Sequence, residues 1–213
     1  MSNIIDLTHV INESMPVFPG TPQPRLITEY TVAINGFMET RLDLLSHTGT
    51  HMDAPAHMLA QGLTLDRMPV STFCGNAVCI DVSGVYDQIE LGDLLQTGID
   101  FTHVDFIVLH TDWSRFWGHP LYFVDFPVLT QEAAHYLVGC GLKGIAADSI
   151  SFDKHDSVSY SVHHILLNAN LVLIENLRNT ALLPKDKVFW FAALPLNYIQ
   201  ADGSPVRAIA SWE

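Results

Sequence analysis

The sequence predicts an α/β fold in a single domain, residues 1–213, with a mixed β-sheet and more strand than helix. Six short segments rich in β-branched and aromatic residues, each bounded by turn residues, alternate irregularly with three helical segments. No repeat, low-complexity tract or charged or Ser/Gly-rich linker marks a domain boundary. A domain of this length hides roughly 70% of its unfolded surface, which is enough for a substantial core.

The expected strands begin near the N-terminus and continue to residue 176. Each combines Val, Ile, Leu, Phe or Thr with flanking Gly, Asn, Asp or Ser residues, as strands between turns do. Their ranges are 3–11, 38–47, 76–84, 104–111, 144–149 and 171–176.

Apolar residues spaced by about 3.6 positions predict the helices. Thr130 is the expected N-cap of the second helix, and Gly139 or Gly141 marks its end. Ser161 is the expected N-cap of the third helix, and Asn170 is expected to take the left-handed conformation at its end. The three helices are expected over 90–98, 130–141 and 161–170.

The composition restricts the partners and the location of the chain. Charged residues make up only 15%, few for a monomer surface, so we expect a homodimer or a larger homo-oligomer such as a tetramer. The formal charge of −13 disfavours binding to nucleic acid or to an anionic membrane surface. The N-terminal residues lack a basic region followed by an apolar one, and no apolar run is long enough to span a membrane, so a cytoplasmic location is expected.

The cysteines give little support to a disulfide framework or a thiolate zinc site. Cys74, Cys79 and Cys140 are odd in number and have no CxxC spacing. We therefore expect all three to be reduced.

A histidine-rich stretch, SHTGTHMDAPAH at 46–57, is the strongest functional signal, because it holds His47, His51, Asp53 and His57. The residues at 48–50 are poor helix formers and Pro55 would break a helix, so an extended segment is expected here. Four extended residues separate two Cα atoms by roughly 13 Å, about the limit for two imidazoles on one metal. The chain is therefore expected to bend at Gly49, and the stretch indicates a metal site.

A second segment, SVHHILLNANLVLIEN at 161–176, offers further ligands. It contains His163 and His164, which diverge by about 100° on a helix, so only one can face the site and the sequence alone leaves both open. Glu175 ends a run of four apolar residues, where an ionised carboxylate is costly unless it binds a metal or is paired. The alternative for Glu175 is a salt bridge to Arg178 or Lys185.

These motifs resemble those of a known family. Residues 47–57 are similar to the H-x-G-T-H-x-D-x-P-x-H signature of the cyclase-like metal-dependent hydrolases, which include bacterial kynurenine formamidase and isatin hydrolase. The similarity continues through IIDLTHVINESMPVFPG, KGIAADSISFD and ALPLNYIQADGSPVRAIA. The resemblance implies a swivelling β/α domain with a barrel-like core and a few flanking helices.

The resemblance also implies a set of metal ligands. One ion corresponds to His47, His51 and Asp53. Asp53 and Glu175 correspond to residues able to bridge to a second ion, which His163 completes. The family pattern places a His twelve residues before the Glu, and this favours His163 over His164.

Two further positions are assigned by the same resemblance. His57 corresponds to the catalytic proton donor and acceptor. Phe18 falls where kynurenine formamidases carry a substrate-contacting Trp, so it is a candidate substrate-binding residue. Thr21 stands where the family often has an Asp.

The residue types agree with amide hydrolysis. Nitrogen and carboxylate ligands without thiolates suit Zn²⁺ or Mn²⁺, as one or two ions. Such an ion activates water and polarises a carbonyl, while His57 can take the proton and return it to the leaving nitrogen. A metal-binding protein without turnover is the alternative from another class, and it would have no need of His57.

The predicted substrate is a small-molecule amide with an aromatic group. An N-formyl aryl amine is expected first, and another aryl or cyclic amide, such as an isatin-like lactam, is the alternative. Besides Phe18, the aromatic residues of TDWSRFWGH are candidates for the pocket lining, or else for the core or a subunit interface. These are Trp113, Phe116 and Trp117.

Overall fold

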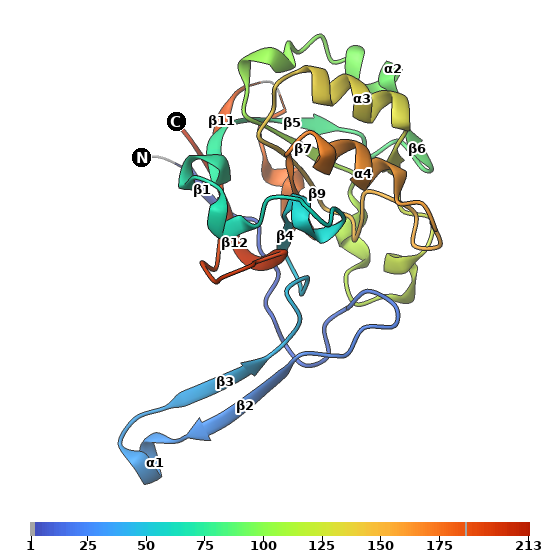
Figure 1. Ribbon diagram of the computed structural model, residues 1–213. Coiled ribbons are helices and arrows are strands. Elements are labelled where there is room, and N and C mark those ends of the chain that lie inside the picture. Colours follow the sequence, from blue (N-terminus) through green and yellow to red (C-terminus); the bar gives the residue numbers. More distant parts are fainter. Residues whose placement is uncertain (1–2, 186) are drawn as a thin grey trace.

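The computed structural model describes residues 3–185 and 187–213, so residues 1, 2 and 186 of the predicted domain lie outside the described residues. Figure 1 shows one central sheet with helices on one side and a long hairpin projecting from the body. Among the described residues, the sheet has eight strands. Their order is β1 (Asn3–Asp6), β12 (Gly203–Trp212), β11 (Phe189–Pro195), β5 (Cys74–Asp81), β7 (Phe106–His110), β9 (Gly144–Ala147), β10 (Val172–Glu175) and β4 (His51–Asp53).

A second pairing, between β12 and β4, closes this sheet into a barrel that β1 extends on the outside. β5, β7, β9 and β10 run parallel to one another, whereas β11 and β4 pair antiparallel with their neighbours. The sheet is therefore mixed and barrel-like, as predicted from the sequence and the family resemblance.

Two apolar layers follow from the alternation of side chains along the parallel strands. In β7, Ile107 and Leu109 pack toward the helices, whereas Phe106 and Val108 pack on the opposite face of the sheet. All four side chains are almost completely buried. The parallel strands are thus apolar on both faces, as strands covered on both sides are.

The helices α2 (Leu91–Leu95), α3 (Gln131–Gly139) and α4 (Ser161–Asn168) lie together over the parallel strands (Figure 1). A short parallel pair, β6 (Gln88–Ile89) and β8 (Val128–Leu129), lies outside the main sheet. Single 3-10 turns connect these elements at Pro55–His57, Leu65–Arg67, Val70–Phe73, Phe101–His103, Trp113–Phe116, Pro120–Phe123 and Thr180–Leu182.

The predicted helix ends are confirmed at one helix and partly wrong at another. The hydroxyl of Thr130 accepts a hydrogen bond from the Ala133 N–H and caps α3. Asn170 follows α4 with a φ of 60°, as predicted. Ser161, however, is the first helical residue of α4 and not its N-cap, which is Tyr160 in the left-handed conformation.

The N-terminus of α4 is capped instead by Asp153, a residue from the preceding loop. Its carboxylate accepts hydrogen bonds from the N–H groups of Val162 and His163. Asp153, which lies outside the helix, therefore provides the N-terminal cap that was expected from Ser161.

A hairpin arm, residues 25–43, projects from the body (Figure 1). It consists of β2 (Arg25–Tyr30), α1 (Val32–Asn35) and β3 (Glu39–Asp43), and β2 and β3 form a separate sheet of two strands. Most of its residues are exposed, including several large apolar ones. The arm therefore has no core of its own.

Each of the six expected strands overlaps an observed strand, while β2, β4, β6, β8, β11 and β12 were not expected. Cys74, Cys79 and Cys140 are free, as predicted. None of the helices in residues 3–185 and 187–213 combines the length and apolar character needed to cross a membrane.

Candidate active site

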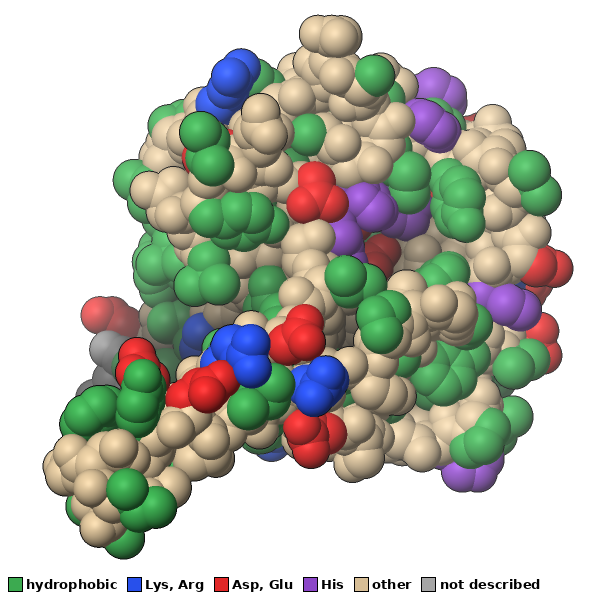
Figure 2. All heavy atoms as spheres, turned by 60° about the horizontal axis from the view of Figure 1, so that its bottom comes forward, with side chains coloured by type: hydrophobic (Ala, Val, Ile, Leu, Met, Phe, Trp, Pro, Cys, Tyr) green, Lys and Arg blue, Asp and Glu red, His purple; other side chains and the backbone are tan. Residues whose placement is uncertain are grey.

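A cavity of about 500 Å³ opens beside the base of the hairpin arm. Figure 2 shows several histidine side chains gathered in a hollow on this face. The lining combines the predicted metal ligands with apolar residues from the N-terminal loop and from the segments around β4 and α4. A cavity of this size accommodates a small organic molecule.

Strand β4 sets the geometry of the cavity floor. It pairs with β10 on one side and β12 on the other, so that His51 lies opposite Glu175 and Asp53 lies opposite Gly203. Alternate residues of a strand share a face, and so do residues directly opposite each other. His51, Asp53 and Glu175 therefore face the cavity, while Met52 packs in the core.

The predicted bend at Gly49 is present. Gly49 has a φ of 67°, and a Cβ at this position would lie 3.1 Å from Met15 Cε. The bend returns His47 to the side of Asp53, where its Nδ1 lies 2.7 Å from Oδ1.

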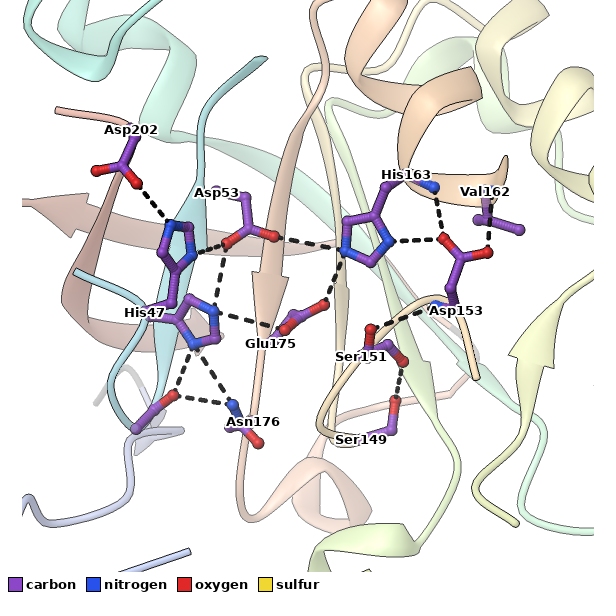
Figure 3. A network of polar contacts seen from close by, with 12 residues as sticks. His47, Asp53, Ser149, Ser151, Asp153, Val162, His163, Glu175, Asn176 and Asp202 are labelled. Carbon is purple, nitrogen blue, oxygen red and sulfur yellow. Dashed lines mark hydrogen bonds and ion pairs between the residues drawn. The ribbon is translucent and has the colours of Figure 1, made fainter. Parts of the chain in front are cut away.

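The five predicted ligands converge on one another (Figure 3). His51 Nε2 lies 3.2 Å from Asp53 Oδ1 and 3.5 Å from Glu175 Oε2. His163 Nε2 lies 3.3 Å from Glu175 Oε1 and 3.7 Å from Asp53 Oδ2. Two groups of ligand atoms result, each spanning no more than 4.8 Å: His47, His51 and Asp53, and Asp53, His163 and Glu175. Asp53 is shared, as in the bridged arrangement that the family resemblance implies.

The structure distinguishes between the two neighbouring histidines of α4. His163 is buried in the cluster, whereas His164 is half-buried and belongs to none of the ligand groups found in the described residues. Glu175 likewise pairs with His51 and His163, and within the described part of the chain it forms no ion pair with Arg178 or Lys185.

Two of the imidazoles are oriented by hydrogen bonds on their far side. His51 Nδ1 lies 2.8 Å from the Gly49 carbonyl oxygen, which can only accept. His163 Nδ1 lies 2.7 Å from Asp153 Oδ2. In both rings Nδ1–H therefore points away from the cluster, and Nε2 faces its carboxylates, as in protein metal sites.

The charges of the cluster fit a divalent cation. Burial and the charge of Asp53 raise the pKa of Glu175. Burial opposes ionisation of Asp53 too, but its interactions with His47 and His51 hold its pKa well below the usual range. Glu175 Oε1 is buried without a hydrogen-bond partner and has only the ion-pair contact with His163 Nε2 at 3.3 Å, so an oxygen ligand is available beside this imidazole. This orphaned atom and the shared donor set fit a metal ion.

Two histidines of the cluster carry raised pKa values. Burial opposes the charged form of His47, but Asp53 and Asp202 raise its pKa to about 9. Burial also opposes the charged form of His163, but Asp153, Glu175 and Asp53 raise its pKa to about 10. In the metal-free protein, both rings are therefore protonated at neutral pH.

The pKa of His57 is lowered, whereas those of His47 and His163 are raised. His57 lies in the 3-10 turn after β4, and its ring centroid is 3.8 Å from that of His47 and 6.5 Å from that of His163. Burial, together with the charges of His47, His163 and His51, lowers the pKa of His57 to about 4, although Asp53 opposes this shift. His57 is therefore neutral at pH 7.

Three polar residues of the site were not assigned from the sequence. Asp153 and Asp202 accept hydrogen bonds from His163 and His47, and Asn176 donates one from its Nδ2 to the Gly49 carbonyl. Their local sequence signals, an Asp after a strand, an Asp-Gly pair and an Asn after Glu, are those of ordinary loops.

The aromatic residues divide into two groups. Phe18 and Thr21 line the cavity. Trp113, Phe116 and Trp117 do not line it but pack in an apolar cluster behind Phe18, and the Trp117 ring stacks on His9 with centroids 3.7 Å apart. Of the alternatives that the sequence left open for these three residues, the structure therefore favours packing in the apolar core, and the 3-10 turn at Trp113–Phe116 places them there.

Comparison with known proteins supports the same fold and identifies the family. A family profile described as "Putative cyclase" matches residues 5–154. The kynurenine formamidase of Geobacillus thermodenitrificans is 31% identical over 211 residues, which cover 98% of this chain and 97% of the relative. A solved structure described as a potential metal-dependent hydrolase with cyclase activity has a TM-score of 0.83 and 28% identity, covering 99% and 98% of the two chains. An isatin hydrolase bound to a product analogue has a TM-score of 0.88 and 22% identity, covering 99% and 92%, which shows the shared fold.

A mixed barrel with a floor of imidazoles and carboxylates, together with these relatives, defines an amidohydrolase. The chain belongs to the putative cyclase family.

We predict that the Glu175→Ala variant loses its metal, because a buried ligand carboxylate cannot be replaced by water without loss of charge compensation. The measurement is elemental analysis of protein purified without added metal. The control is Glu132→Ala, which changes an exposed residue of α3 and should keep the parental metal content. A Glu175→Ala variant with full metal content would falsify this ligand assignment.

We also predict that metal binding releases about two protons at pH 7, because the raised pKa values of His47 and His163 keep both rings protonated in the metal-free protein. These protons are lost as the pH rises through about 9 to 10, so metal affinity should increase from pH 6 to pH 9. Calorimetric titration of the metal-free protein in buffers of different ionisation enthalpy measures this release. Heats that do not depend on the buffer would contradict the prediction.

Proposed function

We propose that this chain hydrolyses a small aryl amide and that its substrate is an N-formyl aryl amine, the class that the name of the Geobacillus relative implies. A cyclic aryl amide, such as an isatin-like lactam, is the alternative. In this proposal one or two Zn²⁺ or Mn²⁺ ions are held by His47, His51, Asp53, His163 and Glu175.

The observation that carries the proposal is the convergence of three imidazoles on two buried carboxylates at the floor of a cavity. The protein surrounds these ligands on one side, and the cavity leaves them accessible to a small molecule on the other. The ion that it fits supplies Lewis acidity, which polarises a carbonyl oxygen and lowers the pKa of water.

His57 is the proposed proton carrier. Its low pKa leaves the ring neutral at pH 7, so it can accept a proton as water attacks the amide carbon. The C–N bond then breaks, and His57 returns the proton to the leaving nitrogen. A protein that only stores a metal needs no such neutral imidazole beside the ligands.

The apolar wall of the cavity supports an aromatic substrate. Phe18, Leu45, Met58, Ile150 and Tyr160 are among the residues that line it. An aryl ring in contact with these side chains would lie with its amide group toward the ligand cluster. We propose Phe18 as a substrate-binding residue on this basis.

A substrate panel tests the proposal directly. Elemental analysis identifies the metal, and formanilides, N-formylkynurenine and isatin are then offered to the metal-loaded protein. Hydrolysis of the formanilides supports the first substrate class, and hydrolysis of isatin alone supports the second. A metal-loaded protein that turns over none of these amides contradicts the proposal.

We predict that His57→Ala keeps its metal and its fold but loses kcat by roughly 10²- to 10⁴-fold, the usual contribution of general acid-base catalysis. The matched control is His164→Ala, which removes an imidazole outside the cluster and should keep the parental rate. Steady-state kinetics and metal analysis are measured together. A parental rate would make His57 a bystander, and loss of metal would make it a ligand.

We further propose that the chain forms a homo-oligomer through its hairpin arm. The arm exposes Ile34 by 84%, Met38 by 66% and Val32 by 65%, and an isolated two-stranded hairpin is marginally stable in water. An exposed apolar patch of this kind marks an interaction site. A second copy of the chain is the proposed partner, since the low charge content also favours self-association.

Sedimentation at micromolar concentration should therefore give at least twice the chain mass of 23.7 kDa. The double variant Ile34→Lys/Met38→Lys should move the protein toward the monomer, because it places charges in the proposed interface. The control is Val158→Lys, which changes an apolar residue that is 95% exposed outside the arm. A parental protein that sediments as a stable monomer would overturn the proposal.

A further inference from the structure

We propose that Asp202 and Gly203 form a cradle that fixes the ring of His47 in its metal-binding orientation, which makes Asp202 a positioning residue for the site. This inference rests on the metal site of the proposed function. The cradle lies in the segment QADGSPV, far from His47 in the sequence.

The ring of His47 is held between two carboxylates (Figure 3). Its Nδ1 lies 2.7 Å from Asp53 Oδ1, and its Nε2 lies 3.0 Å from Asp202 Oδ2. Nδ1 therefore faces the shared ligand carboxylate, and Nε2–H donates to Asp202. The contact with Asp202 keeps a proton on Nε2 and so fixes the tautomer, in which Nδ1 is the ring atom that would bind an ion.

Gly203 supplies the second part of the cradle. A Cβ at this position would lie 2.4 Å from Cε1, 2.7 Å from Nε2 and 2.9 Å from Nδ1 of His47. The imidazole therefore rests against the backbone of Gly203, in space that any side chain would occupy. The requirement for glycine comes from this close approach.

Contacts with strand β4, with Ala54 and with Tyr198 hold the cradle in place. Gly203 of β12 pairs with Asp53 of the adjacent strand β4, and the Ala54 N–H donates to the Asp202 carbonyl at 2.9 Å. The Tyr198 hydroxyl donates to the Gly203 carbonyl. Because Asp53 and the cradle lie on paired strands, both partners of His47 are fixed relative to each other.

His47 needs such a partner more than the other two imidazoles do. Its side chain is 22% exposed, compared with 5% for His51 and 4% for His163. His47 also lies on a loop, whereas His51 is in β4 and His163 is in α4. Asp202 therefore does for His47 what Asp153 does for His163 and the Gly49 carbonyl does for His51.

The test compares metal affinity in matched variants. Asp202→Asn keeps the size of the side chain and removes its charge, and Gly203→Ala places a methyl group against the ring. The controls are Asp100→Asn, an exposed carboxylate distant from the cavity lining, and Gly92→Ala, where a Cβ would meet no atom within 4 Å. Zn²⁺ affinity of the metal-free proteins is measured by competition with a chelator.

We expect Asp202→Asn and Gly203→Ala to bind Zn²⁺ about 10- to 100-fold more weakly at unchanged stoichiometry, the usual effect of losing a partner of a ligand histidine. The controls should keep the parental affinity. The absorption bands of the Co²⁺-loaded Asp202→Asn protein should also shift, because the His47 ring is no longer fixed. A variant that only weakens the fold would lower the melting temperature of the metal-free protein and leave these bands unchanged.

Three results would overturn the inference. Parental Zn²⁺ affinity in Asp202→Asn would show that the carboxylate does not position His47. If Asp202→Asn lost one whole metal equivalent and bound the remaining metal with parental affinity, Asp202 would be a ligand. It would then belong to a ligand group with His47 and His57. Absence of metal binding in the parental protein would contradict the proposed function itself and is thus distinguishable from failure of the variants alone.

Discussion

The pairing of β4 with both β10 and β12 is the constraint on which the rest of the structure depends. Three residues, His51–Asp53, close the barrel and also furnish two of the proposed metal ligands. The same ladders place Glu175 opposite His51 and Gly203 opposite Asp53. Barrel closure and assembly of the site are therefore one structural event, and a shift of β4 by one residue would exchange its ligands for core residues.

The site holds two carboxylates, Asp53 and Glu175, at buried positions. This burial, together with the charge of Asp53, raises the pKa of Glu175. Protonated His47 and His163 offset this charge in the metal-free protein. The side chains of the cluster are thus held close together without a metal, because His47 pairs with Asp53 and His163 pairs with Glu175.

The sequence predicts well the features that single residues determine, and poorly those that depend on contacts between residues far apart in the chain. The bend at Gly49 and the α3 cap at Thr130 follow from the chemistry of single residues, and they are present. Six strands were expected, but β4 has only three residues and a polar composition, so its strand character comes entirely from its neighbours. The role of Asp202 could not be predicted, because it also depends on a contact with a residue distant in the sequence. An Asp-Gly pair indicates only a turn, and no neighbouring residue indicates that His47 lies beside it. The sequence also left open whether Trp113 lines the pocket or packs in the core, because aromatic composition alone cannot distinguish these two positions.

The long sequence separations within the site have a consequence for the order in which the protein forms. The hydroxyl of Thr50 donates to the Asn176 carbonyl across 126 residues, and His47 reaches Asp202 across 155. Contacts that close such long loops carry a high entropic cost and form late in folding. A ribosome releases residues 46–57 long before β10 and β12 exist, so the histidine-rich stretch emerges as an open chain with only part of its ligand set. The full set of proposed ligands and of the residues that orient them therefore exists only after β10 and β12 have joined the barrel.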